Sequence, residues 1–185
     1  MGESCEDMAK TWQISREDQD LLAYESHQKA AAAYARGFYS DLVMPFRGLD
    51  KDNILRPDTS LEKLATLKPA FDKRSGQGTL TAGNSSEQWA HDNNREIQAY
   101  LLDAQVAAVD FVAGEGLLMA PAWAVAQLLK RNNLSLQDFD FYEIHEAFAA
   151  QVLCTLKAWE SEEFCTTKLG MGGALGAIDR SKLNV

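Results

Sequence analysis

His145 and Glu146 are the residues whose types and position most directly suggest chemistry. They stand within FYEIHEAFAAQV (141–152), between a β-like stretch and a helical stretch. A histidine at the end of a strand, beside the unpaired amides of a helix start, can donate to a carbonyl oxygen as negative charge develops on it. The position alone favours a simpler interpretation, in which His145 bonds nearby backbone and Glu146 is stabilised by the helix dipole.

Three cysteines, Cys5, Cys154 and Cys165, are the other groups with the potential for covalent chemistry. Their spacing matches no C-x-x-C pair or Cys/His zinc set, so we expect no metal site and free thiols in a reducing compartment. Cys5 precedes two acidic residues, which disfavour a thiolate. Cys154 lies on an apolar helical stretch, and Cys165 has no histidine nearby in the sequence. None of the three is therefore expected to act as a nucleophile.

Composition narrows the class of protein. The chain has 185 residues, 46% of them apolar and 24% charged, which is typical of a globular protein with one domain or parts of two. Its formal charge of −9 argues against a nucleic-acid partner, because phosphate binding needs clustered Lys and Arg. No apolar run is long enough to span a membrane, and no secretory signal is visible.

The periodicity and the capping residues predict alternating helices and strands in the second half. A capping pair, Ser15 and Asp18, predicts a helix over 16–36, with Gly37 as its stop. Residues 38–79 should be mostly irregular because three prolines interrupt them. The remaining elements that we expect are helices over 3–12, 59–67, 121–131 and 145–159, and strands over 97–112 and 139–144. This order favours a layered α/β fold.

HEAFAAQ closely resembles the Asn/His-Glu-Ala-Phe motif of the thiolases, which exchange acyl groups between a cysteine and coenzyme A. The stretch MGESCEDMAKTWQISREDQD and its Ala-rich helix, RPDTSLEKLATLKPAF (56–71), GTLTAGNSS (78–86) and DRSKLNV resemble further thiolase segments in the same order. The resemblance implies a thiolase-like, layered αβαβα fold that is incomplete. Residues 1–95 would supply a loop region and the end of the N-terminal domain, and residues 96–185 the start of the C-terminal domain.

The same resemblance implies roles for individual residues. His145 matches the residue that forms the oxyanion hole together with a water molecule, and Arg56 falls near the nucleotide end of coenzyme A. A histidine in place of asparagine is similar to the branch found in β-oxidation multienzyme complexes. The partner of that branch is a hydratase/dehydrogenase subunit.

The resemblance also implies a path for the pantetheine arm. Ser86 matches a serine that contacts the arm, while Phe71 and Phe148 match its apolar walls. Met1 matches a methionine near the acyl end, and Leu117 replaces a methionine that the family commonly carries before a Gly-Pro turn.

Two departures from the family separate this chain from an active thiolase. The family's nucleophilic cysteine lies upstream of the segment equivalent to Met1, and its Gly-His-Pro histidine and second cysteine lie downstream of the segment equivalent to Val185. In addition, Ser86 runs directly into EQWAHDNNREIQAY, where the family continues into a strand of small residues. We therefore expect the middle of a thiolase with an internal deletion.

The resulting prediction is a thiolase-like acyltransferase of fatty-acid β-oxidation, which converts 3-ketoacyl-CoA and CoA to acetyl-CoA and acyl-CoA, or runs the reverse condensation. Coenzyme A or acyl-CoA would be the substrate, with no covalently bound cofactor, and the isolated chain would be inactive. The full-length parent would be a homodimer or larger, in the cytoplasm or, in a eukaryote, the mitochondrial matrix. The alternatives are an acyl-CoA-binding chain without turnover, a subunit-interaction fragment, or a gene-model or assembly artefact with no stable existence.

Overall fold

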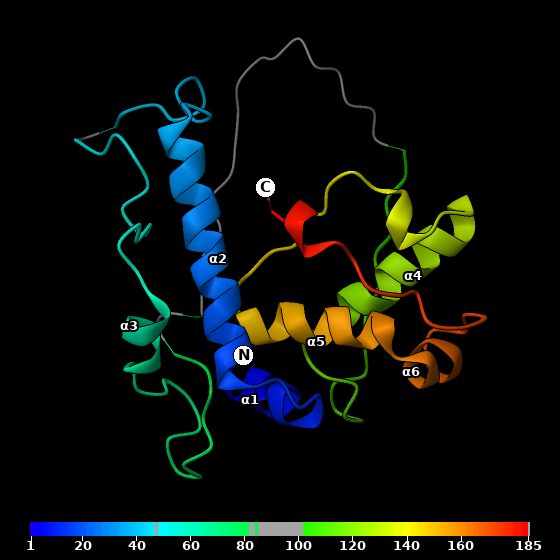
Figure 1. Ribbon diagram of the computed structural model, residues 1–185. Coiled ribbons are helices and arrows are strands. Elements are labelled where there is room, and N and C mark those ends of the chain that lie inside the picture. Colours follow the sequence, from blue (N-terminus) through cyan, green and yellow to red (C-terminus); the bar gives the residue numbers. More distant parts are fainter. Residues whose placement is uncertain (47, 82–83, 85–101, 185) are drawn as a thin grey trace.

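The structure, a computed structural model, describes residues 1–46, 48–81, 84 and 102–184. Helix α5 lies at its centre, with α2 across its N-terminal end, α1 beside it and α6 at its C-terminal end (Figure 1). The helices are α1 (Gly2–Thr11), α2 (Arg16–Ala35), α3 (Leu61–Ala65), α4 (Ala120–Asn132), α5 (Ala149–Glu160) and α6 (Glu162–Thr167), with short 3₁₀ turns at Leu136–Asp138 and Arg180–Lys182.

Local sequence explains where several helices begin and end. The Ser15 hydroxyl accepts the Asp18 N–H at 3.0 Å, and α2 starts at the next residue, as predicted. The helix ends before Gly37, whose φ of +76° is a left-handed conformation that suits glycine. Ser60 caps α3 in the same way, accepting the Lys63 N–H at 3.3 Å. These helices therefore follow the capping pattern of the sequence.

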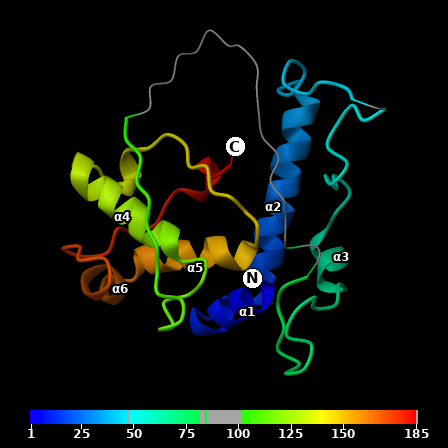
Figure 2. The same ribbon diagram turned by 180° about the vertical axis from the view of Figure 1, so that it is seen from behind.

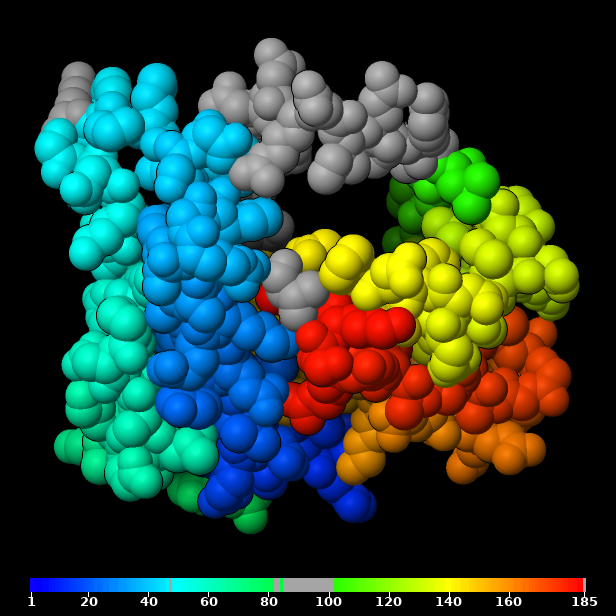
Figure 3. Space-filling view, turned by 45° about the horizontal axis from the view of Figure 1, so that its top comes forward, coloured from blue at the N-terminus to red at the C-terminus, as the bar shows by residue number. Residues whose placement is uncertain are grey.

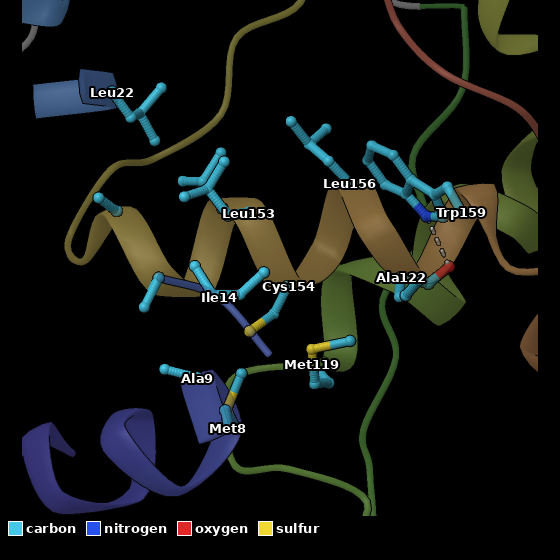
Figure 4. Packing of buried hydrophobic residues seen from close by; sticks show 14 of the residues in the cluster. Met8, Ala9, Ile14, Leu22, Met119, Ala122, Leu153, Cys154, Leu156 and Trp159 are labelled. Atoms are coloured by element: carbon cyan, nitrogen blue, oxygen red, sulfur yellow. Dashed lines mark hydrogen bonds between the residues drawn. The ribbon is translucent and has the colours of Figure 1, made fainter. Parts of the chain in front are cut away.

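The hydrophobic core is built around α5, in which almost every residue is buried. Figure 4 shows Cys154 of this helix on the side of α1, Leu153 on the side of Leu22 in α2, and Trp159 against Ala122 of α4. The Trp159 Nε1–H donates to the Ala122 carbonyl at 3.4 Å, which ties α5 to α4. The first and second halves of the sequence therefore share one core.

The two predicted strands are not found as paired strands. Residues 102–110 are extended but pair with no strand in the described part of the chain, and residues 97–101 of that prediction lie outside it. The stretch 139–144 forms a single parallel bridge, between Tyr142 and Leu183. A strand needs a neighbouring strand for its hydrogen bonds, and within the described residues these two stretches have only the bridge between Tyr142 and Leu183.

The C-terminal segment lies alongside α2. The Lys29 ammonium donates to the carbonyls of Arg180, at 3.2 Å, and Leu183, and Arg180 forms an ion pair with Glu25 at 3.6 Å. Figure 3 shows this segment, in red, between α2 and the yellow and green residues of the second half. The segment thus bridges α2 and the Tyr142 region.

Candidate functional site

His145 lies in an extended, exposed stretch that precedes α5. The helix begins at Ala149, with Phe148 at its N-cap, so the prediction of a helix starting at residue 145 is wrong by four positions. A residue from a distant part of the chain contacts this stretch: the side chain of Asn184 accepts the Ile144 N–H at 2.8 Å and donates to the Ile144 carbonyl at 2.9 Å. These bonds hold the backbone extended up to the histidine.

Glu146 points into the protein, whereas the neighbouring His145 is exposed. Its carboxylate accepts a hydrogen bond from Asn184 Nδ2 at 2.6 Å, and the residue is partly buried. It also lines a cavity of about 350 Å³. Glu146 is therefore a wall residue rather than the first-turn carboxylate of a helix.

The cavity lies between α2, α3 and the start of α5, and it combines apolar and basic groups. Its lining residues are Leu22, Ala23, Ser26, His27, Ile54, Arg56, Thr59, Lys63, Leu64, Leu67, Asn84, Glu146 and Ala149. Arg56 was predicted from the sequence as a site residue. It lines the cavity together with Glu146, which follows His145, and Ala149, which follows Phe148. A volume of several hundred cubic ångströms is in the range of small-molecule sites.

The loop before α3 positions Arg56. Its guanidinium Nη1 donates to the carbonyls of Asn53 at 2.7 Å, Ile54 at 2.9 Å and Leu55 at 3.1 Å. The Arg56 backbone N–H donates to His27 Nδ1 at 3.4 Å. Burial, and then the nearby Arg56 charge, lower the pKa of His27 below its ordinary value.

His27 and Lys63 are cavity residues that the sequence reasoning missed. Four cavity residues lie on one face of α2, because they recur at helical spacing: Leu22, Ala23, Ser26 and His27. This shared helix face was the signal from which the sequence could have indicated His27. Lys63 also forms an ion pair with Asp58 at 3.0 Å, in which both side chains are exposed. The cavity therefore has a basic side formed by Arg56 of the loop before α3 and by Lys63 of α3.

Asn84 lines the cavity and forms hydrogen bonds with three other segments of the chain. Its Nδ2 donates to Asp20 at 3.0 Å, its Oδ1 accepts the Thr81 N–H at 2.8 Å, and its carbonyl accepts the Ala149 N–H at 3.1 Å. The last bond satisfies an amide at the start of α5. Ser86, predicted to contact the pantetheine arm, lies outside the described residues.

Phe71 and Phe148, predicted from the resemblance as two walls, are in contact. Their ring centroids are 6.4 Å apart in an edge-to-face arrangement. Gly2 lies against the Phe71 ring so closely that a Cβ atom there would come within 2.3 Å of it. Met1 directly precedes Gly2 in the chain, and its own side chain is 77% exposed.

Leu117 is only partly buried and does not line the cavity. It follows Gly116, which has a φ of +86° in the turn before α4, and a Cβ at Gly116 would lie 2.8 Å from the Met119 side chain. The structure therefore separates Leu117 from the residues around Arg56.

None of the three cysteines in the sequence is presented as a nucleophile. All three are fully buried. Burial raises the pKa of the Cys5 and Cys154 thiols to about 12. Cys165 Sγ lies 3.4 Å from the Ala158 carbonyl and 3.3 Å from the Trp159 carbonyl. These thiols are inert parts of the core.

The described residues contain no group of three or more His, Cys, Asp or Glu side chains that could hold a metal ion. No helix among them is both long and apolar enough to cross a membrane.

Comparison with known proteins shows what the chain is similar to. The family model for the thiolase N-terminal domain matches residues 1–88, and the model for the thiolase C-terminal domain matches residues 95–185. The 3-ketoacyl-CoA thiolases of Yersinia enterocolitica and Shewanella baltica are each 39% identical over 204 residues, a match that covers 100% of this chain and 46% of each relative.

Solved structures give the same result. The acetyl-CoA acetyltransferase of Bacillus anthracis matches with a TM-score of 0.71 at 32% identity, and the dimeric peroxisomal thiolase of Saccharomyces cerevisiae with 0.70 at 30%. Each match covers 100% of this chain and 46% of the solved chain. The predicted layered α/β fold class is therefore confirmed, in a partial form: this chain spans about half the length of its relatives.

Proposed function

The chain belongs to the thiolase family, and from that premise we propose that the cavity beside Arg56 holds part of a coenzyme A thioester. The proposed parent reaction is the thiolysis of 3-ketoacyl-CoA by CoA to acetyl-CoA and a shortened acyl-CoA, or the reverse condensation. The observation that supports this proposal is the composition of the cavity, in which apolar residues adjoin Arg56 and Lys63. A coenzyme A ester needs an apolar path for its arm and cations for its phosphates.

Within this proposal, His145 donates an N–H to the thioester oxygen while negative charge develops on it. Its exposed position in an extended stretch leaves the imidazole accessible to a ligand. Phe71 and Phe148 form the apolar wall along the arm, and their edge-to-face contact supports a shared role. Met1 would lie at the acyl end of that wall.

Two further contacts complete the proposed path for the ligand. Ser86 would bond the pantetheine arm, and Leu117 would replace a methionine contact of the family. Both assignments rest on the resemblance alone.

The isolated chain should bind without turnover. Thiolysis proceeds through an acyl group on a cysteine, and each cysteine of this sequence is buried. We predict no consumption of 3-ketoacyl-CoA when the purified chain is mixed with it and CoA. Consumption of 3-ketoacyl-CoA above that of a blank without the chain would contradict this prediction.

Replacing Arg56 by alanine should test the binding step. We expect Arg56→Ala to weaken acetyl-CoA binding roughly 10- to 100-fold, because a charge-assisted hydrogen bond to a phosphate is lost. Isothermal titration calorimetry measures the affinity directly. Arg74→Ala is the matched control, since Arg74 is exposed and does not line the cavity. Equal affinities for the two variants would place the ligand elsewhere.

Assembly with other subunits is a second proposal. The yeast relative, described as a dimeric thiolase, supports a homodimer or larger assembly. A hydratase/dehydrogenase subunit is proposed as an additional partner from the histidine in HEAF. Sedimentation velocity of the chain, alone and mixed with such a subunit, tests each association separately.

A further inference from the structure

The side chain of Asn184 bonds the residues on both sides of His145. Its Oδ1 accepts the Ile144 N–H at 2.8 Å, and its Nδ2 donates to the Ile144 carbonyl at 2.9 Å and to Glu146 Oε1 at 2.6 Å. Figure 1 and, from behind, Figure 2 show the C-terminal segment, in red, beside the stretch that leads into α5. One side chain therefore holds both neighbours of the histidine.

The residue type at position 184 suits this set of bonds. The Ile144 N–H needs an acceptor, whereas the Ile144 carbonyl and the Glu146 carboxylate each need a donor, and an amide side chain supplies one acceptor and two donor hydrogens. Asn184 also has a φ of +49°, a left-handed conformation that asparagine adopts more readily than most residues. Side-chain chemistry and backbone conformation therefore both favour asparagine here.

The backbone around Asn184 is itself anchored to the rest of the protein. The Asn184 N–H donates to the Tyr142 carbonyl at 2.8 Å, and the Tyr142 N–H donates to the Lys182 carbonyl at 3.0 Å. The intervening Leu183 is 2% exposed and belongs to the core, and its carbonyl accepts a hydrogen bond from Lys29 of α2. The Asn184 side chain is therefore held by the core and by α2.

His145 has no comparable support of its own. The residue is exposed and makes no hydrogen bond with another described residue. An imidazole that stabilises a developing oxyanion is most effective when it is held in position before the charge appears. Within the described part of the chain, the hydrogen bonds that determine where His145 lies are those of Ile144 and Glu146.

We propose that Asn184 is a positioning residue for His145: its side chain fixes Ile144 and Glu146 and thereby directs the imidazole toward the thioester oxygen. This inference rests on the proposed oxyanion role of His145 and adds the group that determines where His145 lies. Asn184 does not line the cavity beside Arg56. Its effect on a bound ligand should therefore depend on His145.

Backbone ¹⁵N relaxation of the full chain tests the positioning without any ligand. Asn184→Gly keeps the left-handed φ but removes the side-chain bonds, so the order parameter of the His145 amide should fall from about 0.85 to below about 0.6. Lys182→Ala is the matched control, because it removes a 3.2 Å bond to the Phe139 carbonyl between the same two segments, and it should leave the order parameter unchanged. An unchanged order parameter in Asn184→Gly overturns the proposal.

A double-mutant cycle with acetyl-CoA, measured by calorimetry, tests whether Asn184 acts through His145. Asn184→Gly and His145→Ala should each weaken the affinity about three- to tenfold, the effect of one lost hydrogen bond. In the His145→Ala chain, Asn184→Gly should change the affinity less than twofold. Equal losses from Asn184→Gly with and without His145 overturn the proposal, because a purely structural role gives that result.

The same titrations separate this inference from the proposed function. Unchanged affinity in His145→Ala overturns the inference, while the Arg56→Ala comparison still decides whether the cavity binds the ligand. If the unmodified chain binds no acetyl-CoA, the proposed function fails, whereas the relaxation data still decide whether Asn184 positions His145.

Asn184→Asp provides a second variant if Asn184→Gly does not fold. Its carboxylate still accepts the Ile144 N–H, but it loses both donor hydrogens and brings a second negative charge beside Glu146. It should therefore change the order parameter and the affinity in the same direction as Asn184→Gly. Circular dichroism checks that each variant keeps its helices.

Discussion

His27 shows how a single side chain in the cavity can make the protein sensitive to pH. It is partly buried and lies beside Arg56, and both features lower its pKa below the ordinary value of 6.5. The folded protein therefore binds fewer protons at this site than the unfolded chain does. The stabilisation is present above the unfolded pKa and is lost as pH falls below it.

We accordingly predict that the free energy of unfolding decreases from about pH 7.5 to about pH 5.5, and that His27→Gln weakens this dependence. Urea unfolding at the two pH values measures the difference. Ser26→Ala is the control, because it alters the neighbouring cavity position without removing a titrating group. An unchanged pH dependence in His27→Gln would assign the effect to other groups.

At the same scale, the sequence predicted some site residues through the family resemblance and missed others. Arg56 was identified and does line the cavity, and Phe71 and Phe148 touch. His27 and Lys63 were not identified, because their nearness to Glu146 depends on how α2 and α3 pack. Such packing joins residues far apart in the sequence and leaves little local pattern.

At the scale of elements, a buried carboxylate holds α1 in place. Glu6 is 1% exposed and accepts hydrogen bonds from the Thr79 N–H at 2.9 Å, the Thr79 hydroxyl at 2.8 Å and the Leu80 N–H at 2.8 Å. Without the carboxylate, the buried N–H of Leu80 and the partly buried donors of Thr79 would lose this partner. The segment before Asn84 is therefore anchored to the first helix.

Glu6→Ala should lower the free energy of unfolding by about 2–4 kcal/mol, since several buried hydrogen bonds are lost together. Glu3→Ala, on the same helix, should cost less than about 1 kcal/mol because Glu3 is exposed and accepts only the Asp72 N–H. Chemical denaturation of both variants gives the comparison. Similar losses for the two would show that Glu6 has no special anchoring role.

The sequence predicted helices better than strands, and hydrogen bonding explains the difference. Ser15, Ser60 and Pro121 mark helix starts within one or two residues, because a helix satisfies its backbone locally. The patterns at 97–112 and 139–144 were strand-like, yet a strand forms only where another strand lies beside it. Local patterning contains no information about that neighbour.

At the scale of the whole molecule, α5 joins the parts matched by the two family models. It packs against α1, α2, α4 and α6. Leu153 lies on the side of α5 that faces Leu22 of α2, so Leu153→Ala should cost about 2–5 kcal/mol and reduce amide protection in α2 and α5 together. Hydrogen exchange with mass spectrometry measures both regions, with exposed Glu160→Ala as the control. A loss confined to α5 would mean that the parts unfold separately.

The central position of α5 also affects how the protein is made. Met8 and Ala9 of α1 belong to the same buried core as α5, and Lys157 of α5 bonds the Trp12 carbonyl across 145 positions of sequence. At ordinary rates of synthesis, a ribosome needs roughly 7–30 s to cover that distance. During this interval, the apolar face of α1 cannot yet pack against α5. A newly made chain is therefore most open to chaperone capture, or to aggregation, before α5 leaves the ribosome.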